Sequence, residues 1–156
     1  APFPERHLVV CPASTLGNWE REVRKWCPAL RVHVYHGPQG ERRLLREALD
    51  EQGFELLLTT YSIFQGDSEG SRADRGWLMD KTWALCVLDE AHALKRAESA
   101  QFQECHAMLC YAMLCYAVLC CAVLCCAMLC YAMLCYAMLC HVSSGSPSCA
   151  RASVCC

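Results

Sequence analysis

The chain has 156 residues, which is enough for one domain with a hydrophobic core. Its formal net charge of −2 gives no overall attraction for nucleic acid, so any DNA binding must depend on local groups. The averages conceal a junction. Of the 14 basic and 16 acidic residues, all but Arg151 lie at or before Glu104, whereas 13 of the 16 cysteines lie at or after Cys105. The three earlier cysteines are scattered, which favours a reducing compartment.

Three regions follow from this shift in composition. Residues 1–104 have the mixed usage of a globular domain, residues 105–141 are a low-complexity repeat, and residues 142–156 are expected to be a disordered tail. The chain opens with "APFPERHLVV", without an initiator Met or a signal sequence. We therefore expect an internal piece of a longer protein.

The first predicted elements are a strand at 7–12 and a helix that ends before Pro28. Ser14 or Thr15 is predicted to cap this helix. Its apolar residues fall on one face at helical spacing and are expected to be buried. They are Leu16, Trp19, Val23 and Trp26. A second strand is predicted at 31–37.

A second amphipathic helix is predicted at 40–53, with Leu44, Leu45 and Leu49 facing inward. A third strand follows at 54–61. The polar, glycine-bearing stretch 65–76 is predicted to be a surface loop, 77–83 a short helix, and 84–92 a fourth strand that runs into a turn.

Alternating strands and helices predict an α/β fold in which a parallel sheet carries helices on both faces. Ligands of such sheets bind beyond the carboxyl ends of the strands. The segments to inspect are therefore "CPASTLGNW", "TTY" and "DEAH".

The segment "CVLDEAH" at 86–92 places two adjacent carboxylates, Asp89 and Glu90, at a strand end. In a nucleoside triphosphatase, the first would hold Mg²⁺ through its water shell and the second would activate the attacking water. His92 could then sense the γ-phosphate. The alternative is an exposed acidic pair at a turn.

Two further segments carry weaker signals. In "PASTLGNW" at 12–19, hydroxyls and backbone N–H groups at a helix N-terminus suit a phosphate, although simple helix capping is favoured when the segment is taken alone. In "LLLTTY" at 56–61, Thr59 and Thr60 offer hydroxyls at a strand end. Neither segment is informative alone.

Read in order, "HLVVCPASTLGNWEREVRKWCP", "FELLLTTY" and "VLDEAHALK" resemble motifs Ia, Ib and II of the SWI/SNF-related ATPases. These are superfamily-two helicase relatives that translocate on duplex DNA. The chain looks closest to the DEAD/H-box-containing SMARCAD-type chromatin remodellers. The resemblance covers roughly residues 7–100 and implies a partial first RecA-like lobe within residues 1–104.

The resemblance implies ATP and Mg²⁺ as cofactors, with Asp89 and Glu90 as the cation-holding and water-activating carboxylates and His92 as a coupling residue. It implies duplex DNA and nucleosomes as partners in the nucleus, contacted without sequence-specific readout. The residues that match the DNA-facing motifs are Ser14, Asn18, Thr59, Thr60 and Tyr61. Trp19 also lies in motif Ia, but its place on the apolar face favours a core role.

The sequence departs from the family pattern. Ala91 stands where the family commonly has Gly, and Arg96 where it commonly has Asn. No Gly-Lys-Ser/Thr phosphate-binding loop occurs anywhere in the chain, and the motifs of the second lobe are missing. We therefore expect the chain alone to be inactive.

The repeat at 105–141 is built from Ala-Met/Val-Leu-Cys-Tyr/Cys units and is expected to be helical or disordered. Its uncharged length would span a bilayer, and its flanks argue neither way, but a spanning helix fused to a nuclear-type ATPase would be unusual, so membrane association is disfavoured. Cysteines five residues apart gather on no helix face, which disfavours a metal site. A pentapeptide β-helix is disfavoured by the apolar outward positions. The interchanges of Tyr, Cys and His correspond to single-base transitions, which indicates a translated tandem DNA repeat.

Two functions therefore stay open. The first is a fragment of an ATP-dependent, chromatin-remodelling DNA translocase. The second is a non-catalytic interaction or membrane-associated fragment with an apolar, cysteine-rich tail. An RNA helicase with an Asp-Glu-Ala-His motif is disfavoured by the 12–19 segment.

Overall fold

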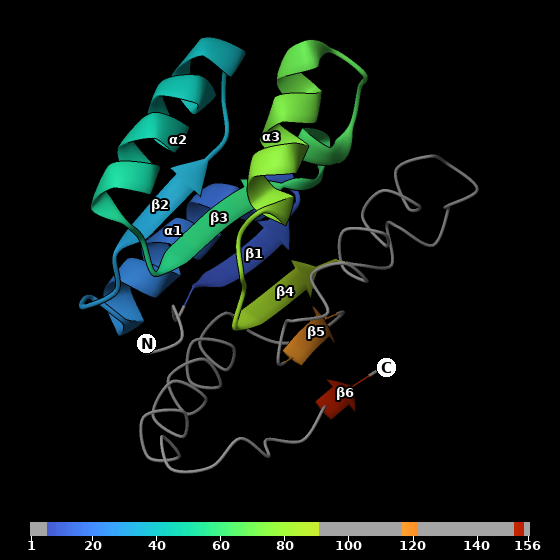
Figure 1. Cartoon of the computed structure of the whole chain (residues 1–156). Helices are drawn as coiled ribbons and strands as arrows, with labels where there is room; N and C mark the ends of the chain where they lie inside the picture. The colour runs from blue at the N-terminus through green and yellow to red at the C-terminus, as the bar shows by residue number, and fades with distance from the viewer. Residues whose placement is uncertain (1–5, 91–116, 122–151, 155–156) are drawn as a thin grey trace.

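The computed structural model describes residues 6–90, 117–121 and 152–154 (Figure 1). Strands and helices alternate along the first 90 residues, as the sequence predicts. The strands are β1 (His7–Cys11), β2 (Val32–Tyr35), β3 (Leu56–Thr60), β4 (Leu85–Asp89), β5 (Ala117–Cys121) and β6 (Ala152–Val154). The helices are α1 (Ala13–Trp26), α2 (Gln39–Gln52), the 3₁₀ helix η1 (Tyr61–Phe64) and α3 (Glu69–Met79).

All strands are parallel, in the order β2-β3-β1-β4-β5-β6. The register places Val9 of β1 opposite Leu58 of β3 on one side and Val87 of β4 on the other. Because β1 lies between β3 and β4 and is parallel to both, the segments that follow β1, β3 and β4 emerge at the same edge of the sheet. This shared carboxyl edge brings the three predicted motifs together.

The helices cover both faces of the sheet, with α1 on one face and α2 and α3 on the other (Figure 1). Successive strand residues alternate between the two layers. Val9, for example, packs with Trp19 and Val23 of α1, whereas Leu8 and Val10 pack in the layer that includes residues of α2 and α3. A sheet buried on both faces explains why its strands read as continuous apolar runs.

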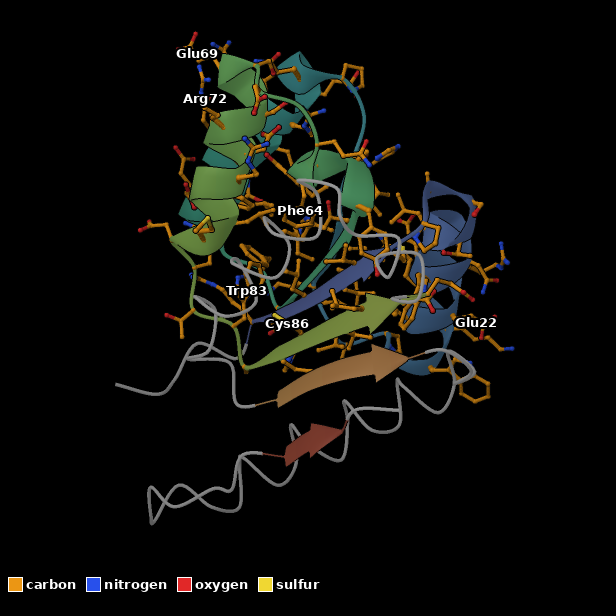
Figure 2. All side chains as sticks on the ribbon, turned by 90° about the vertical axis from the view of Figure 1, so that its right-hand side faces the viewer. Glu22, Phe64, Glu69, Arg72, Trp83 and Cys86 are labelled. Carbon is orange, nitrogen blue, oxygen red and sulfur yellow. The ribbon has the colours of Figure 1, made fainter. Side chains whose placement is uncertain are left out.

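Side-chain direction follows the same division (Figure 2). Phe64, Trp83 and Cys86 lie on the α3 side of the sheet, where all three are buried. Glu69 and Arg72 lie on the outer surface of α3. The α/β fold with a parallel sheet and helices on both faces is therefore confirmed.

The third helix differs from the prediction. Residues 65–76 were expected to be a surface loop and 77–83 a short helix, but one helix, α3, runs from Glu69 to Met79. Ser68 begins it, because its side chain accepts a hydrogen bond from the Ser71 backbone N–H at 3.1 Å. The inward face carries Asp74 as well as Leu78. A charged residue at a core position concealed the amphipathic pattern.

The start of α1 also differs. Neither Ser14 nor Thr15 caps it, since the N-cap residue is Pro12 and no side chain makes a cap hydrogen bond. The Thr15 hydroxyl instead donates to the Pro12 carbonyl at 3.0 Å. Two predicted core residues are exposed: Trp26 at 50% on the last turn of α1 and Leu44 at 61% on α2.

Two short segments of the C-terminal third form strands. Ala117–Cys121, within the repeat predicted to be helical or disordered, is β5 and pairs with β4. Ala152–Val154, within the predicted disordered tail, is β6 and pairs with β5. On the side of β4 that faces away from β1, the backbone N–H and carbonyl groups are available for pairing. The apolar run Ala-Val-Leu-Cys-Cys of β5 pairs with them. The rest of the repeat and tail lies outside the described residues. Within the described ranges, no helix has the length and apolar character needed to cross a membrane.

Candidate nucleotide and nucleic-acid site

Asp89 and Glu90 lie together at the carboxyl end of β4, where the sequence places them. Asp89 is the last residue of the strand and Glu90 follows it, and both are partly exposed. Glu90 has a φ of 55°, in the left-handed region that residues with a Cβ rarely adopt. Such backbone occurs preferentially at functional sites. The turn therefore places two adjacent, partly exposed acidic residues at the edge where α/β sheets bind ligands.

The Asp89 side chain is held by an indole that sequence reasoning assigned only to the core. Trp19 is buried to 1% exposure, and its Nε1–H donates to Asp89 Oδ2 at 2.8 Å. The two residues are 70 positions apart. Apolar periodicity predicts the burial of Trp19, but it does not show where the polar end of the ring is directed.

Tyr61 contacts the same residue from another side. It is the first residue of η1, directly after β3, and its hydroxyl donates to the backbone carbonyl of Asp89 at 2.6 Å. The segments after β1 and β3 thus both reach the end of β4. Three segments that sequence analysis singled out separately are joined at one aspartate.

Thr59 is one of the residues predicted to contact DNA. Its residue is fully buried, and its hydroxyl donates to the Tyr35 carbonyl at 2.8 Å. Thr60 is 1% exposed, with its hydroxyl 3.1 Å from His36 Nδ1 and 2.8 Å from the Ser62 hydroxyl. Both hydroxyls are engaged by other groups of the chain in this structure, and the contact of these threonines with a DNA backbone stays a prediction.

The other predicted residues have different surroundings. Ser14 and Asn18 are exposed on α1, and Asn18 Oδ1 accepts a hydrogen bond from Arg21 at 2.6 Å. The hydroxyl of Tyr61 is engaged by Asp89, as described above. His92 lies outside the described residues. Among the residues that the structure does describe, no group of three or more His, Cys, Asp or Glu side chains is placed to hold a metal ion.

The comparisons with known proteins agree with the motifs. The model of the family described as SNF2-related domain matches residues 2–117. The chain belongs to this SNF2-related family. The match takes in all of β1 to β4 and the carboxylate pair at the end of β4.

Relatives and a solved structure place the SNF2-related segment in context. It is 45% identical over 98 residues to ATP-dependent helicase fft1 of Schizosaccharomyces pombe, covering 63% of this chain and 10% of the relative. It is 41% identical over 99 residues to a Drosophila melanogaster SWI/SNF-related matrix-associated actin-dependent regulator of chromatin, subfamily A containing DEAD/H box 1 homolog, covering 62% and 11%. The chain thus spans about a tenth of either relative's length. The Sulfolobus solfataricus SWI2/SNF2 ATPase core in complex with dsDNA is 31% identical, with a TM-score of 0.49 over 65% of this chain and 18% of that one.

A second carboxylate of this SNF2-related chain, Asp74 of α3, was missed by sequence reasoning. It is fully buried and accepts from Arg42 Nε at 2.9 Å and Nη2 at 2.6 Å, and from the Tyr35 hydroxyl at 2.5 Å. Arg46 Nη1 completes the group through Oδ1, and Arg42 also donates to the Gly37 carbonyl. The cluster joins β2, α2 and α3. Two arginines one helical turn apart were the available signal, but nothing in the sequence indicated their shared partner.

The surroundings of three groups change their pKa values. Burial, followed by the hydrogen bond and charge of Asp74, raises the pKa of Tyr35 well above its usual range. Burial and the nearby charges of Arg24 and Arg31 lower the pKa of His33 on β2. For Asp50 on α2, burial acts upward, but hydrogen bonds from Lys81 and Trp77 outweigh it and lower the pKa. None of the three lies at the carboxylate pair.

Proposed function

We propose that this chain forms part of the first RecA-like, ATP-binding lobe of an ATP-dependent DNA translocase that remodels nucleosomes in the nucleus. The observation that carries the proposal is the pair Asp89 and Glu90 at the carboxyl end of an interior parallel strand, with Asp89 held by residues from the two preceding motifs. Membership of the SNF2-related family supports it.

The residues at this edge fit a hydrated magnesium ion. Asp89 is partly exposed, and its Oδ2 is engaged by a neutral N–H group rather than by a cationic side chain. Mg²⁺ prefers oxygen ligands and retains several waters. Bound with ATP, it would neutralise the charge on the phosphates. Asp89 would hold the ion through water, and the Glu90 carboxylate would orient the attacking water and accept its proton.

DNA contact is assigned to the exposed polar residues on the first turns of α1. Ser14 and Asn18 are exposed beyond the carboxyl end of β1, next to the strand that carries Asp89. A hydroxyl and an amide suit phosphate oxygens, which position a duplex without reading its sequence. The burial of Thr59 and Thr60 leaves these α1 residues as the stronger candidates.

Residues 1–156 contain no Gly-Lys-Ser/Thr sequence, so these residues alone do not provide the backbone cradle and lysine that hold the β- and γ-phosphates. We therefore expect this chain by itself to show no DNA-stimulated ATP hydrolysis. Activity in the purified chain that disappears with Glu90→Gln would contradict this expectation.

A chimera tests the positive part of the proposal. The matching 98-residue segment of the fission yeast relative would be replaced by its counterpart here, and DNA-stimulated ATP hydrolysis would be measured. We expect an active chimera whose rate falls roughly 10²- to 10⁴-fold with Glu90→Gln, the usual contribution of a general base. Ser14→Ala and Asn18→Ala should weaken DNA binding, whereas Thr82→Ala, an exposed hydroxyl before β4, should not. An active chimera indifferent to Glu90→Gln would refute the proposal.

A further inference from the structure

We infer that Trp19 and Tyr61 are positioning residues that fix the Asp89 carboxylate and the Asp89–Glu90 peptide for a divalent cation, an inference that rests on the proposed function. Each residue donates one hydrogen bond to Asp89, at 2.8 Å to the carboxylate and at 2.6 Å to the backbone carbonyl. They arrive from α1 and η1, which are separate elements.

The Trp19 donor cannot move independently of the core. Its ring is 1% exposed and packs in the layer between α1 and the sheet, together with Leu16, Val23 and the β4 residue Val87. Close packing leaves such a ring one orientation. The indole N–H therefore offers a fixed point at which Asp89 Oδ2 is held, and the carboxylate loses its freedom to rotate.

The hydrogen bond from Trp19 to Asp89 is made by an uncharged donor. An indole N–H is a neutral donor that cannot accept a hydrogen bond or lose its proton in this pH range. It orients Oδ2 without cancelling the negative charge, which an arginine at the same place would offset. Oδ1, the other acceptor of the group, belongs to a partly exposed residue at the ligand-binding edge. This is the behaviour expected of a partner that orients a cation ligand from behind.

The peptide between Asp89 and Glu90 is held by Tyr61. Glu90 has a φ of 55°, a backbone conformation that persists only where neighbouring contacts enforce it. The Tyr61 hydroxyl donates to the carbonyl of the peptide bond that enters Glu90. This contact fixes the orientation of that peptide plane. Tyr61 therefore sets the direction in which the turn presents Glu90, while Trp19 sets Asp89.

The indole bond is tested by NMR on the full chain, which contains four tryptophans. The Trp19 indole N–H signal should shift in Asp89→Ala, which removes the acceptor. Glu22→Ala and Asp50→Ala remove the carboxylate acceptors of the Trp26 and Trp77 indoles and show the size of shift to expect. The Trp83 indole, which donates to the Leu78 carbonyl, should not shift in Asp89→Ala. A Trp19 signal insensitive to Asp89→Ala would overturn the inference.

The positioning role is tested with Mn²⁺, a paramagnetic ion that takes the same oxygen ligands as Mg²⁺. Titrated into the full chain, it should broaden the backbone amide signal of Glu90. Trp19→Phe and Tyr61→Phe should each raise the Mn²⁺ concentration needed for this broadening by roughly tenfold, as loss of a group that orients a metal ligand commonly does. Trp83→Phe is the matched control, because Trp83 is equally buried and also loses an indole hydrogen bond. Its Mn²⁺ response should match that of the unaltered chain.

The outcomes separate the inference from the function on which it rests. If Mn²⁺ broadens Glu90 equally in the unaltered chain and in the Trp19→Phe and Tyr61→Phe variants, the positioning role is overturned and the cation site stands. If Mn²⁺ leaves Glu90 of the unaltered chain unbroadened, the cation site itself is overturned. If Trp19→Phe does not fold, Tyr61→Phe, which keeps the ring, decides the matter alone.

Discussion

Asp74 and Asp89 carry the same type of side chain in opposite surroundings, one buried and the other partly exposed. Asp74 is fully buried and receives hydrogen bonds from two guanidinium groups and a phenol. Asp89 is partly exposed and receives one hydrogen bond on its carboxylate from a neutral indole. The first carboxylate is compensated by cations of its own chain, whereas the second is engaged by an uncharged donor.

The difference separates the structural role of Asp74 from the cation-binding role proposed for Asp89. A buried carboxylate persists only when cations and donors compensate its desolvation, and the Asp74 cluster meets this condition while joining α2, α3 and β2. A carboxylate that serves a cation must be oriented but not neutralised. A neutral donor such as the Trp19 indole does this for the Asp89 carboxylate, in agreement with the proposed role of that residue.

The largest expected effect comes from removing the compensated carboxylate. Asp74→Ala leaves Arg42 and Arg46, each with a side chain 15% exposed, facing each other without their anion. We expect a loss of about 3 kcal/mol in the free energy of unfolding, the low end for breaking a buried ion pair because the arginines retain some solvent. Urea denaturation measures it. Asp67→Ala, which removes a side chain 94% exposed and 4.0 Å from Arg75, should leave the midpoint unchanged. Equal midpoints for the two variants would show that the cluster does not stabilise the fold.

A smaller effect is expected from Tyr35→Phe. The variant keeps the ring, which stacks on Trp77 with centroids 5.2 Å apart, but loses the hydroxyl that donates to Asp74. The cost should be about 1–2 kcal/mol at neutral pH.

The same variant changes the response to alkali. Folding raises the pKa of Tyr35 above its usual value of 10.0, so the native state keeps the phenol protonated. The contribution of this group to the free energy of unfolding is therefore present below pH 10 and is lost as the pH rises above that value. Phenylalanine removes this term. Urea midpoints measured from pH 8 to pH 11 should therefore fall less steeply for the variant. Parallel slopes would show that the phenol of Tyr35 titrates normally in the folded chain.

Periodicity in the sequence predicted the sheet and α1 and α2 because each buries apolar residues at a regular spacing. Continuous apolar runs predicted parallel strands, and β1 to β4 lie where expected. The same reasoning missed α3, since Asp74 stands where an apolar residue would normally face the core. Its compensation by Arg42 and Arg46 depends on contacts 28 to 32 residues apart, which no local pattern records.

For the candidate site, the sequence indicated the right segments but not every side-chain role. The Asp89–Glu90 pair was found because adjacent carboxylates at a strand end are a local feature. The hydrogen bonds of Thr59 and Trp19 were not predicted. The sequence does not show whether a hydroxyl at a strand end, or the N–H group of an indole on an apolar face, is directed to solvent or to another strand. Only the packing of α1 against β4 directs Trp19 to Asp89, and only the pairing of β3 with β2 directs Thr59 to the Tyr35 carbonyl.

The smallest change in stability is expected from Asp89→Asn, and it tests the contrast between the two aspartates directly. The amide oxygen still accepts the Trp19 hydrogen bond, and among the described residues no salt bridge involves Asp89. We expect the free energy of unfolding to change by less than about 1 kcal/mol, whereas Asp74→Asn, the same substitution beside two arginines, should cost more. Urea midpoints with equal m-values measure both. In the chimera with the fission yeast relative, the order should reverse: Asp89→Asn should abolish ATP hydrolysis, and Asp74→Asn should leave it measurable in the molecules that remain folded. Equal losses of stability would mean that the charge of Asp89 contributes as much to the fold as that of Asp74. That result would contradict the proposal that Asp89 is a cation ligand.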